Sequence, residues 1–544
     1  MKQFKLQKAD YTLSRLCLNA SEKYKDKTAF SMIVDGRICK SVTYAQMGVH
    51  ARRLAGCLKQ TGIKKGERIL LLSENCPEWP AAYFGIAMAG AVSVPVLTGF
   101  STEQIQNIIN HCQASAVCIS ASLAEKYRSE DNQPFNNIRL IIIDNKEDEV
   151  NYACNNWLDY TDQKPDDLAV IIYTSGTSGN SKGVMLSGRN LITSAISSFT
   201  FIKTNTRDRL LSVLPLAHSY ECSLGLLAPL MQGSCITYID RPPSPSVLLP
   251  AFKLLRPTVM ITVPLLMEKI YNNSIAPKLK KNKLYKFRLT RSAAARIAGK
   301  KLISVMGGKL RFLGIGGAPL STETEKFLNE AKFPYSIGYG LTEAAPLVAG
   351  NSPLRFFGKK GYRIPDGIKV RIERCLDNLD SREGEIQITG ENVMLGYYND
   401  GQKTSEAMTA DGWLRTGDLG SVDKKGRLYI RGRLKALILG PSGENIYPEE
   451  IEELLGSSSL VEESLVYPGK KGELVALVRL SETAKNILYG EVSRAAEKAE
   501  HALEELRTWV NKKLAVFSRL SSIKIKHEPF EKTPTMKIKR YLYI

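Results

Sequence analysis

The stretch Tyr173-Thr-Ser-Gly-Thr-Ser-Gly-Asn-Ser-Lys-Gly183 is the segment from which the fold of this 544-residue chain is best inferred. It follows an apolar run, residues 168–173, that predicts a buried strand. Glycines let backbone N–H groups turn toward a phosphate, hydroxyls add donors, and Lys182 adds positive charge. A Walker A loop has Gly before its Lys and Ser or Thr after it, whereas Ser181 precedes Lys182 here and Gly183 follows it. The pattern therefore favours a different phosphate-binding loop, at the end of a strand, over a flexible linker.

Short β-branched runs alternate with helical patterns on both sides of this loop, which predicts βαβ units and largely parallel sheets. The predicted strands are residues 68–72, 116–119, 138–143, 168–173, 210–214 and 259–263. Near residue 384 the strands become shorter, and an amphipathic helix follows around residues 492–510. We expect an α/β fold: a large multi-layer α/β domain over residues 1–432, mostly parallel sheets plus a small β-barrel-like part, and a small mobile α+β domain over residues 433–544.

The composition, 43% hydrophobic and 24% charged residues, is typical of a globular protein. Ten cysteines without a Cys-x-x-Cys pair indicate reduced thiols in a cytoplasmic protein. Five histidines without a His-Glu-x-x-His motif argue against a transition-metal site held by the protein. The longest apolar stretch, residues 81–100, contains three glycines and a proline, so we predict a packed helix and a buried strand rather than a membrane span.

The net charge of +20 is distributed unevenly. Residues 269–322 contain thirteen Lys and Arg and no Asp or Glu, and residues 277–302 within them predict a helix. Such a face suits nucleotide phosphates, an acidic lipid surface or nucleic acid, or it is simply solvated. No nucleic-acid-binding motif accompanies the charge, so we expect no nucleic-acid partner. Peripheral contact with an anionic membrane, at its inner face, is the hypothesis that this segment raises.

The phosphate loop resembles the signature loop of the acyl-adenylate-forming superfamily, which includes acyl-CoA synthetases, non-ribosomal peptide adenylation domains and beetle luciferases. The resemblance covers nearly the whole chain, because seven further motifs follow in the family's order. They are Leu214-Pro-Leu-Ala-His218, Gly316-Gly-Ala-Pro319, Tyr339-Gly-Leu-Thr-Glu343, Thr416-Gly-Asp418, Gly432-Arg433, Asn445-Ile-Tyr-Pro448 and Lys532-Thr-Pro-Thr-Met-Lys537.

The resemblance implies a site for ATP and Mg²⁺. It places the Tyr339 ring on adenine, Thr342 on the α-phosphate and Glu343 on Mg²⁺, a cation that prefers carboxylate and phosphate oxygens. Asp418 would bind the ribose hydroxyls, and Arg433 would complete the ribose and phosphate contacts. The nucleotide-binding residues implied by the resemblance are Thr174, Ser175, Gly176, Thr177, Ser178, Gly179, Lys182, Gly316, Gly317, Ala318, Pro319, Tyr339, Gly340, Thr342, Asp418 and Arg433.

The resemblance also implies a mobile catalytic lysine. Lys537 would neutralise the charge that develops when a carboxylate attacks the α-phosphate, together with Thr342 and Glu343. Lys435 would be the hinge about which the small domain turns. His218 would line the carboxylate end of the acyl site, with Tyr220 and Glu221 shaping the same pocket. Two departures are Ala436, where the family often has Asp, and Met536, where Gly is common.

The implied enzyme is an AMP-forming ligase that makes a carbon–sulfur bond with coenzyme A. Three stretches resemble long-chain fatty acyl-CoA synthetases: residues 218–221, residues 257–271 and residues 440–450. The Phe-Asp pair that amino-acid adenylation domains have near position 218 is absent. Rival readings are an aryl or medium-chain acid ligase, a ligase that loads an acyl carrier protein, an inactive nucleotide-binding regulator, and a luciferase-like oxygenase.

Overall fold

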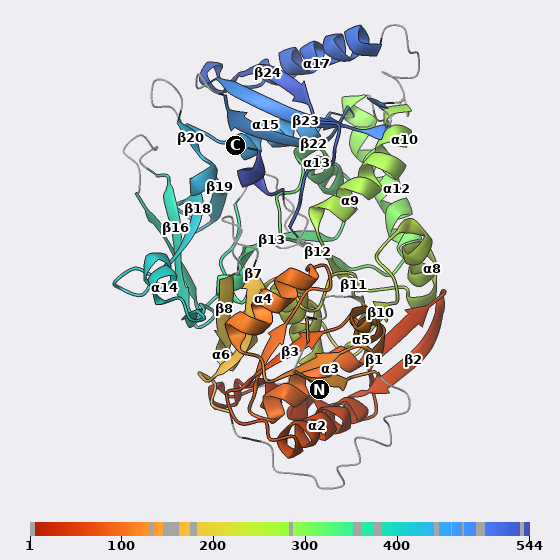
Figure 1. The fold of residues 1–544 in the computed structure, drawn as a ribbon. Helices are drawn as coiled ribbons and strands as arrows, with labels where there is room; N and C mark the ends of the chain where they lie inside the picture. The colour runs from red at the N-terminus through yellow and green to blue at the C-terminus, as the bar shows by residue number, and fades with distance from the viewer. Residues whose placement is uncertain are drawn as a thin grey trace.

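A computed structural model describes residues 6–543 apart from residues 130–133, 136–137, 145–160, 162, 175–181, 282–284, 286, 352–360, 375–381, 440–444, 459, 470–472, 483, 486–494 and 534–537. Two large mixed sheets form the body of the molecule, a smaller antiparallel sheet flanks them, and a C-terminal unit lies at one end (Figure 1).

The first large sheet is parallel except at its two edges. Its strand order is β14 (Leu347–Gly350), β13 (Tyr335–Gly340), β12 (Phe312–Ile315), β11 (Val259–Thr262), β9 (Arg209–Leu211), β10 (Cys235–Ile239), β1 (Thr28–Val34) and β2 (Arg37–Thr43). Because parallel strands end at a common edge, the residues after β12 and β13 lie side by side.

The second large sheet is parallel from β7 to its far edge and antiparallel at β8 and β17. Its strand order is β17 (Gly396–Tyr397), β8 (Lys182–Ser187), β7 (Leu168–Thr174), β4 (Val92–Pro95), β3 (Arg68–Leu72), β5 (Ala116–Ile119) and β6 (Arg139–Ile142). Strands β7 and β8 form the antiparallel pair that flanks the phosphate loop, with Thr174 opposite Lys182.

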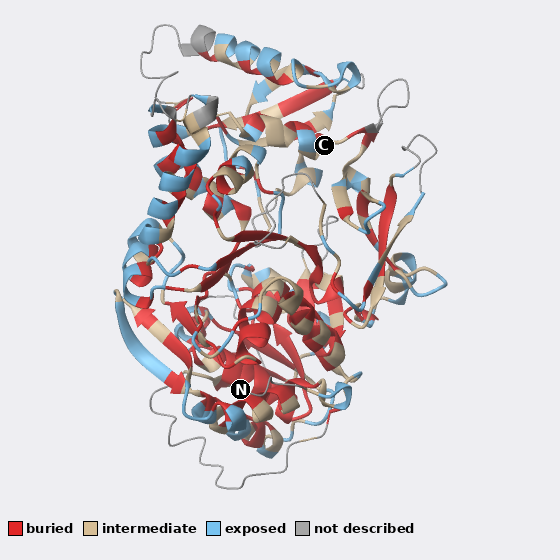
Figure 2. Ribbon diagram, turned by 180° about the vertical axis from the view of Figure 1, so that it is seen from behind, coloured by how far each residue is buried: buried red, intermediate tan, exposed pale blue. Residues whose placement is uncertain are grey.

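Helices cover these sheets and pack between them. The helices are α1 (Leu13–Lys23), α2 (Tyr44–Gln60), α3 (Glu78–Met88), α4 (Thr102–Cys112), α5 (Ala121–Arg128), α6 (Gly188–Ser197), α7 (Ala228–Leu230), α8 (Pro245–Leu255), α9 (Pro264–Ile270), α10 (Ala276–Lys281), α12 (Arg288–Val305), α13 (Thr322–Glu330) and α14 (Gly401–Ala407). One apolar cluster contains residues of both large sheets, such as Phe30 of β1 and Val170 of β7. The two sheets therefore share a core, which is visible as the buried centre of the molecule in Figure 2.

Local sequence sets where several of these helices begin and how closely they pack. Capping boxes start α2, α4 and α6, through the pairs Thr43–Gln46, Ser101–Gln104 and Ser187–Asn190. In each box two side-chain oxygens accept hydrogen bonds from two backbone N–H groups at the helix start, and a cap of this kind stabilises by about 1 kcal/mol. In α3, a Cβ on Gly85 would lie 2.8 Å from the Ala51 carbonyl oxygen, so glycine is what allows α2 and α3 to cross so closely.

Where a β-barrel-like part was expected, the structure has a smaller, open four-stranded sheet. It is antiparallel, in the order β15 (Ile368–Glu373), β16 (Gly384–Gly390), β18 (Leu414–Val422) and β19 (Leu428–Arg433). The register of its last pair sets Asp418 opposite Arg433. This pairing brings two of the predicted nucleotide-binding residues together.

The C-terminal unit has a core of its own, which includes Leu455, Val478 and Val510. Its elements are β20 (Ile438–Leu439), β21 (Asn445–Ile446), α15 (Pro448–Gly456), β22 (Val461–Pro468), β23 (Leu474–Leu480), α17 (Ala495–Asn511) and β24 (Leu520–Ile525). It contacts the body where Thr322 N, at the start of α13, donates to Glu453 Oε1 at 3.0 Å. The domain boundary that we place between residues 432 and 433 falls at the end of β19 and stays a prediction.

The α/β fold class agrees with expectation, and two local predictions need correction. The strand predicted over residues 210–214 ends at Leu211, because the following segment turns to bond Asn75, whose Nδ2 donates to the Leu214 carbonyl at 2.6 Å. The helix predicted over residues 277–302 is interrupted at Phe287, whose backbone is extended (φ −87°, ψ 130°); within the described residues, α10 lies before this point and α12 begins directly after it. Residues 81–100 form most of α3 and then β4, as predicted. Among the described helices, none combines the length and the hydropathy that a membrane crossing needs.

Candidate active site

The end of β13 and the loop after it carry four of the predicted site residues. Strand β13 ends with Tyr339 and Gly340, and a single 3-10 turn, Thr342–Ala344, follows. A Cβ on Gly340 would lie only 2.0 Å from the Pro346 carbonyl oxygen, so this position admits glycine alone. The tight return of the chain into β14 directs Tyr339, Thr342 and Glu343 to the carboxyl edge of the sheet, where α/β folds bind ligands.

Tyr339 is bound to Asp418, a residue of the smaller sheet. Tyr339 Oη donates to Asp418 Oδ2 at 2.6 Å, and Arg433 Nε lies 2.9 Å from Asp418 Oδ1. Arg433 Nη1 also donates to the Thr416 carbonyl at 3.1 Å. Burial, together with the negative charge of Asp418, raises the pKa of Tyr339 well above its ordinary value, so the hydroxyl keeps its proton. Two sheets thus contribute to one polar cluster.

Glu343 and Lys182 both contact one aromatic residue, Tyr397. Tyr397 Oη donates to Glu343 Oε1 at 2.9 Å, and Lys182 Nζ lies 4.9 Å from the centre of the Tyr397 ring. Strand β17 pairs Tyr397 with Val184, which places the ring next to the lysine that begins β8. Burial and the charge of Glu343 raise the pKa of Tyr397, so it remains a donor. Sequence analysis missed Tyr397, because only strand pairing reveals its position.

The segment around His218 reaches the same loop. Ser219 Oγ lies 3.2 Å from Thr342 Oγ1, and Ser219 is buried. His218 Nδ1 accepts a hydrogen bond from Tyr220 N at 3.1 Å, which fixes the orientation of the imidazole ring. The structure therefore brings His218 and Thr342 into one neighbourhood, through Ser219. Ser219 could not be singled out from the sequence, because a serine next to a histidine is common in loops.

The remaining predicted residues are distributed as follows. Gly316 lies against the Tyr220 ring, where a Cβ would be 3.1 Å from Cζ, and residues 317–319 after it are exposed. Lys435 is exposed in the 3-10 turn Leu434–Ala436 that follows β19. Ser175, Gly176, Thr177, Ser178, Gly179 and Lys537 lie outside the described residues. Thr174 and Lys182, which flank the phosphate loop, are paired across β7 and β8.

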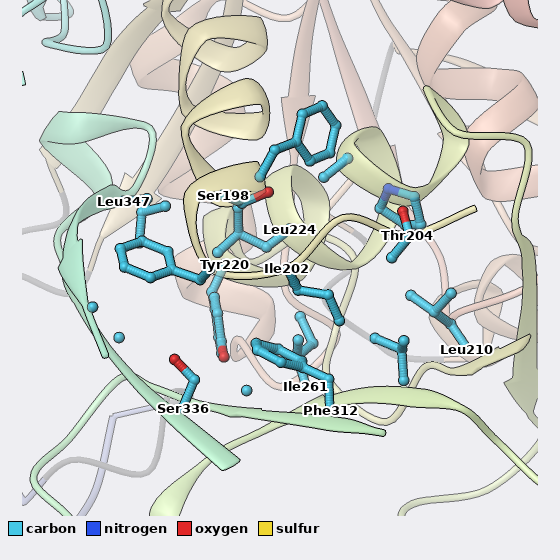
Figure 3. A pocket seen from close by; sticks show the side chains of 18 residues that line it. Ser198, Ile202, Thr204, Leu210, Tyr220, Leu224, Ile261, Phe312, Ser336 and Leu347 are labelled. Atoms are coloured by element: carbon cyan, nitrogen blue, oxygen red, sulfur yellow. The ribbon is translucent and has the colours of Figure 1, made fainter. Parts of the chain in front are cut away.

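An apolar pocket opens beside this polar cluster (Figure 3). Its empty space is about 590 Å³, counting the part open to solvent, and none of the eighteen described residues that line it is charged. Tyr220, Ile261 and Phe312 are among the side chains around it (Figure 3). Gly314 and Gly338 form part of its wall, so the sheet itself leaves room there. Such a space suits the hydrocarbon part of a ligand whose polar end lies at the cluster.

Glu221 does not line this pocket but is buried behind it. It begins a π-helical turn, Glu221–Leu227, and Ser212 Oγ donates to its Oε1 at 2.6 Å. A Cβ on Gly225 would lie 2.5 Å from the same oxygen, so the carboxyl group fits only because residue 225 is glycine. Burial raises the pKa of Glu221 to about 8. Of the two residues expected to shape the pocket, Tyr220 lines it directly and Glu221 supports the helix beneath it.

The donor set can be compared with what a metal ion needs. No group of three or more His, Cys, Asp or Glu side chains converges to hold a metal within the described part of the chain. The cluster offers Glu343 as a carboxylate oriented by Tyr397. One carboxylate is what Mg²⁺ requires when substrate phosphates supply much of its shell, so these residues fit that ion better than a cage made by the protein alone.

Similarity to known proteins extends over most of the chain. The family model described as "AMP-binding enzyme" matches residues 18–398. Long chain acyl-CoA synthetase 1 of Arabidopsis thaliana is 28% identical, over 94% of this chain and 86% of its own length. 4-Coumarate–CoA ligase 3 of Oryza sativa subsp. japonica is also 28% identical, over 93% of this chain and 88% of its own.

Solved structures show the same fold. The o-succinylbenzoate CoA synthetase MenE of Bacillus subtilis, in complex with its acyl-adenylate OSB-AMP, superimposes with a TM-score of 0.77 at 22% identity and covers 98% of this chain and 97% of its own. The same enzyme in complex with ATP and magnesium ion gives a TM-score of 0.74 at 22% identity over 97% of this chain and 98% of its own.

Proposed function

This chain belongs to the AMP-binding enzyme family, and we propose that it uses ATP to activate a carboxylic acid as an acyl-adenylate and then transfers the acyl group to coenzyme A. Curated relatives that align over most of the chain are acid–CoA ligases. The observation that carries the proposal is the junction of a phosphate-loop lysine, a carboxylate and a ribose-type Asp–Arg pair with an uncharged pocket.

In the proposed first step, a carboxylate oxygen of the acid attacks the α-phosphorus of ATP. A new O–P bond forms, and the bond from that phosphorus to the bridging oxygen of pyrophosphate breaks. Thr342 would contact the α-phosphate, Lys182 and Lys537 would offset the developing negative charge, and Tyr339 and Asp418 would hold the adenosine. Mg²⁺, held by Glu343 and the phosphates, would neutralise charge on the phosphate oxygens.

In the proposed second step, the thiol sulfur of coenzyme A attacks the acyl carbon and gives up its proton to solvent, while the bond from that carbon to the AMP oxygen breaks and AMP leaves with the electron pair. The small unit would turn about Lys435 between the steps, which withdraws Lys537 and admits the thiol. An acyl-adenylate hydrolyses readily, so a water-poor site is needed meanwhile. The apolar pocket and the buried Ser219 suit that need.

We further propose that the acid is a long-chain fatty acid. No charged side chain lines the pocket within the described part of the chain, so an acid with a second carboxylate or an ammonium group would bury that charge without a partner there, at a cost of several kcal/mol. A hydrocarbon chain meets no such penalty. The 28% identity to a 4-coumarate ligase keeps aryl acids as the second candidate, since an aromatic ring is also uncharged.

The test is ATP–pyrophosphate exchange with a panel of acids, with and without coenzyme A or an acyl carrier protein. We expect exchange with long-chain acids and thioester formation with coenzyme A. Lys537→Ala should lower the exchange rate by about a hundred- to a thousandfold, whereas Lys539→Ala, two residues away, should not. Failure of every acid to support exchange would refute the adenylation proposal, and a preference for aryl acids would refute only the fatty-acid part.

A further inference from the structure

One outer edge of the body carries exposed hydrophobic side chains. In the described part of the chain, six of the thirteen large exposed hydrophobic residues fall within residues 249–305, about a tenth of the sequence. They are Leu249, Leu254, Leu265, Phe287, Ile297 and Val305. Scattered exposed hydrophobic residues are normal on proteins, but such a concentration usually marks a site of interaction.

The same edge is strongly cationic. Residues 241–322 contain sixteen Lys and Arg and a single acidic residue, Glu268. The Glu268 carboxylate is itself engaged, because its Oε1 accepts a hydrogen bond from Ser321 N at 2.7 Å. Arg291 and Arg311 are bound to acidic residues from other segments, Glu330 and Asp208, so we leave them out of the surface.

Helices α8 and α12 turn both kinds of side chain outward. On α12, Ile297 and Val305 are 66% and 48% exposed, and Arg296, Lys300 and Lys301 are exposed beside them. On α8, Lys253 is exposed between Leu249 and Leu254. The opposite sides of both helices are buried in one apolar cluster, through residues such as Phe252 and Ala295. Figure 1 places α8, α12 and α10 along one edge of the molecule, and Figure 2 shows the same edge from behind with much of α12 exposed.

We propose that this edge, the α8–α12 surface (Leu249, Lys253 and Leu254 of α8 with Arg296, Ile297, Lys300, Lys301 and Val305 of α12), binds the face of a bilayer that contains anionic lipids. Aliphatic side chains enter the boundary between headgroups and acyl chains, while the long stems of Lys and Arg carry their charges to the lipid phosphates. Each Lys or Arg near an anionic surface strengthens binding about fivefold. The proposal does not depend on which acid the enzyme activates.

Other partners fit these residues less well. The cores of protein–protein interfaces are depleted of lysine, whereas Lys300 and Lys301 stand next to the exposed aliphatic residues of α12. Single-stranded nucleic acid is bound by stacking on aromatic rings, and five of the six exposed hydrophobic residues are aliphatic. Mixed aliphatic and cationic residues on outward helix faces are typical of proteins that lie on membranes.

The experiment is co-sedimentation of the full chain with two kinds of vesicle, phosphatidylcholine alone and phosphatidylcholine mixed with phosphatidylglycerol. We expect binding to the anionic vesicles, weakened at high salt, and much weaker binding to the neutral ones. Replacing Lys300 and Lys301 together by alanine should lower the partition coefficient on anionic vesicles roughly thirtyfold. The matched control, alanine at Lys424 and Lys425, removes two adjacent exposed lysines from the β18–β19 turn and should leave binding unchanged.

A second variant tests the aliphatic residues. Ile297→Ser combined with Val305→Ser should lower binding to the anionic vesicles at least about tenfold, because less apolar surface is buried. Equal binding to both vesicles, or no effect of the Lys300 and Lys301 change, would overturn the proposal. Loss of binding in the lysine variant with no effect of the serine variant would also overturn it, and would indicate a general polyanion surface. Exchange activity with a water-soluble acid, measured without vesicles, should be unchanged in every variant, which separates this result from failure of the proposed reaction.

Discussion

Tyr397→Phe is the substitution that tests the polar cluster most directly. It removes one oxygen atom, the Oη that donates to Glu343 Oε1 at 2.9 Å, and keeps the ring that faces Lys182 Nζ at 4.9 Å. Without this donor the Glu343 carboxylate loses a partner that fixes its rotation. The proposed metal–nucleotide complex must then orient the carboxylate as it binds.

The expected magnitude follows from the type of contact. Removing a partner that orients a metal-binding carboxylate typically costs ten- to a hundredfold in metal affinity or activity, and a hydrogen bond to a charged group contributes about 1.5–3 kcal/mol. Tyr397→Phe should therefore raise the Mg²⁺ concentration for half-maximal activity at least about tenfold. Tyr397→Leu also removes the cation–π contact with Lys182, a contact that contributes about 0.5–2 kcal/mol. This variant should therefore weaken the binding of ATP as well.

The assay is ATP–pyrophosphate exchange as a function of Mg²⁺ at saturating acid. Tyr398→Phe is the matched control, because it removes the same atom from the next residue. The Tyr398 ring packs against the His111 ring, with the two ring centres 5.8 Å apart. The reasoning is refuted by a Tyr397→Phe enzyme with the Mg²⁺ dependence of the original, or by an equal defect in Tyr398→Phe. A change only in the KM for the acid would also refute it, because Tyr397 would then act on the acid and not on the metal–nucleotide complex.

Two further changes test the pocket and its surroundings. Gly338→Leu should lower kcat/KM for long-chain acids at least about tenfold in the exchange assay and leave kcat/KM for short acids unchanged. A Cβ at Gly338 would have its nearest neighbour, Ile315 O, at 4.0 Å, so the new side chain fits and would fill the pocket. Equal losses for all chain lengths would contradict this. Because burial raises the pKa of Glu221 to about 8, the folded state holds a proton that the unfolded state releases above about pH 4.5, so stability should fall as pH rises from about 4.5 to 8. Thermal unfolding of Glu221→Gln should lack that part of the pH dependence, and parallel Tm profiles for the two proteins would show that Glu221 does not titrate in this way.

The strands and turns that carry the predicted site could be found from the sequence, because each motif is a short continuous stretch of residues. The strand before the phosphate loop, β7, and the turn after β13 follow from apolar runs that end in Gly, Ser and Thr. Residues that act through pairing between distant strands could not be found in this way. Tyr397 lies 54 residues from Glu343, and its role depends on the register of β17 against β8.

Helix continuity was the other limit of the sequence. Residue types that favour helices run through residues 277–302, yet the backbone of Phe287 is extended and interrupts the helical pattern directly before α12. Helix propensity is a weak prior that tertiary context overrides. The Phe287 side chain is 68% exposed, so the alternation of apolar and polar residues in the sequence does not mark it as the point of interruption.

The short distance along the chain between Arg433 and Lys435 has a consequence for the order of events during turnover. Arg433 is tethered to Asp418 in the body, and the proposed pivot begins two residues later. A rotation that starts beyond this ion pair would leave the proposed contacts to the ribose of AMP in place while the rest of the small unit turns. The acyl-adenylate would then stay bound through its AMP part while the small unit changes from the adenylation arrangement to the thiol-transfer arrangement. Its release before thiol transfer would require the Asp418–Arg433 ion pair to break.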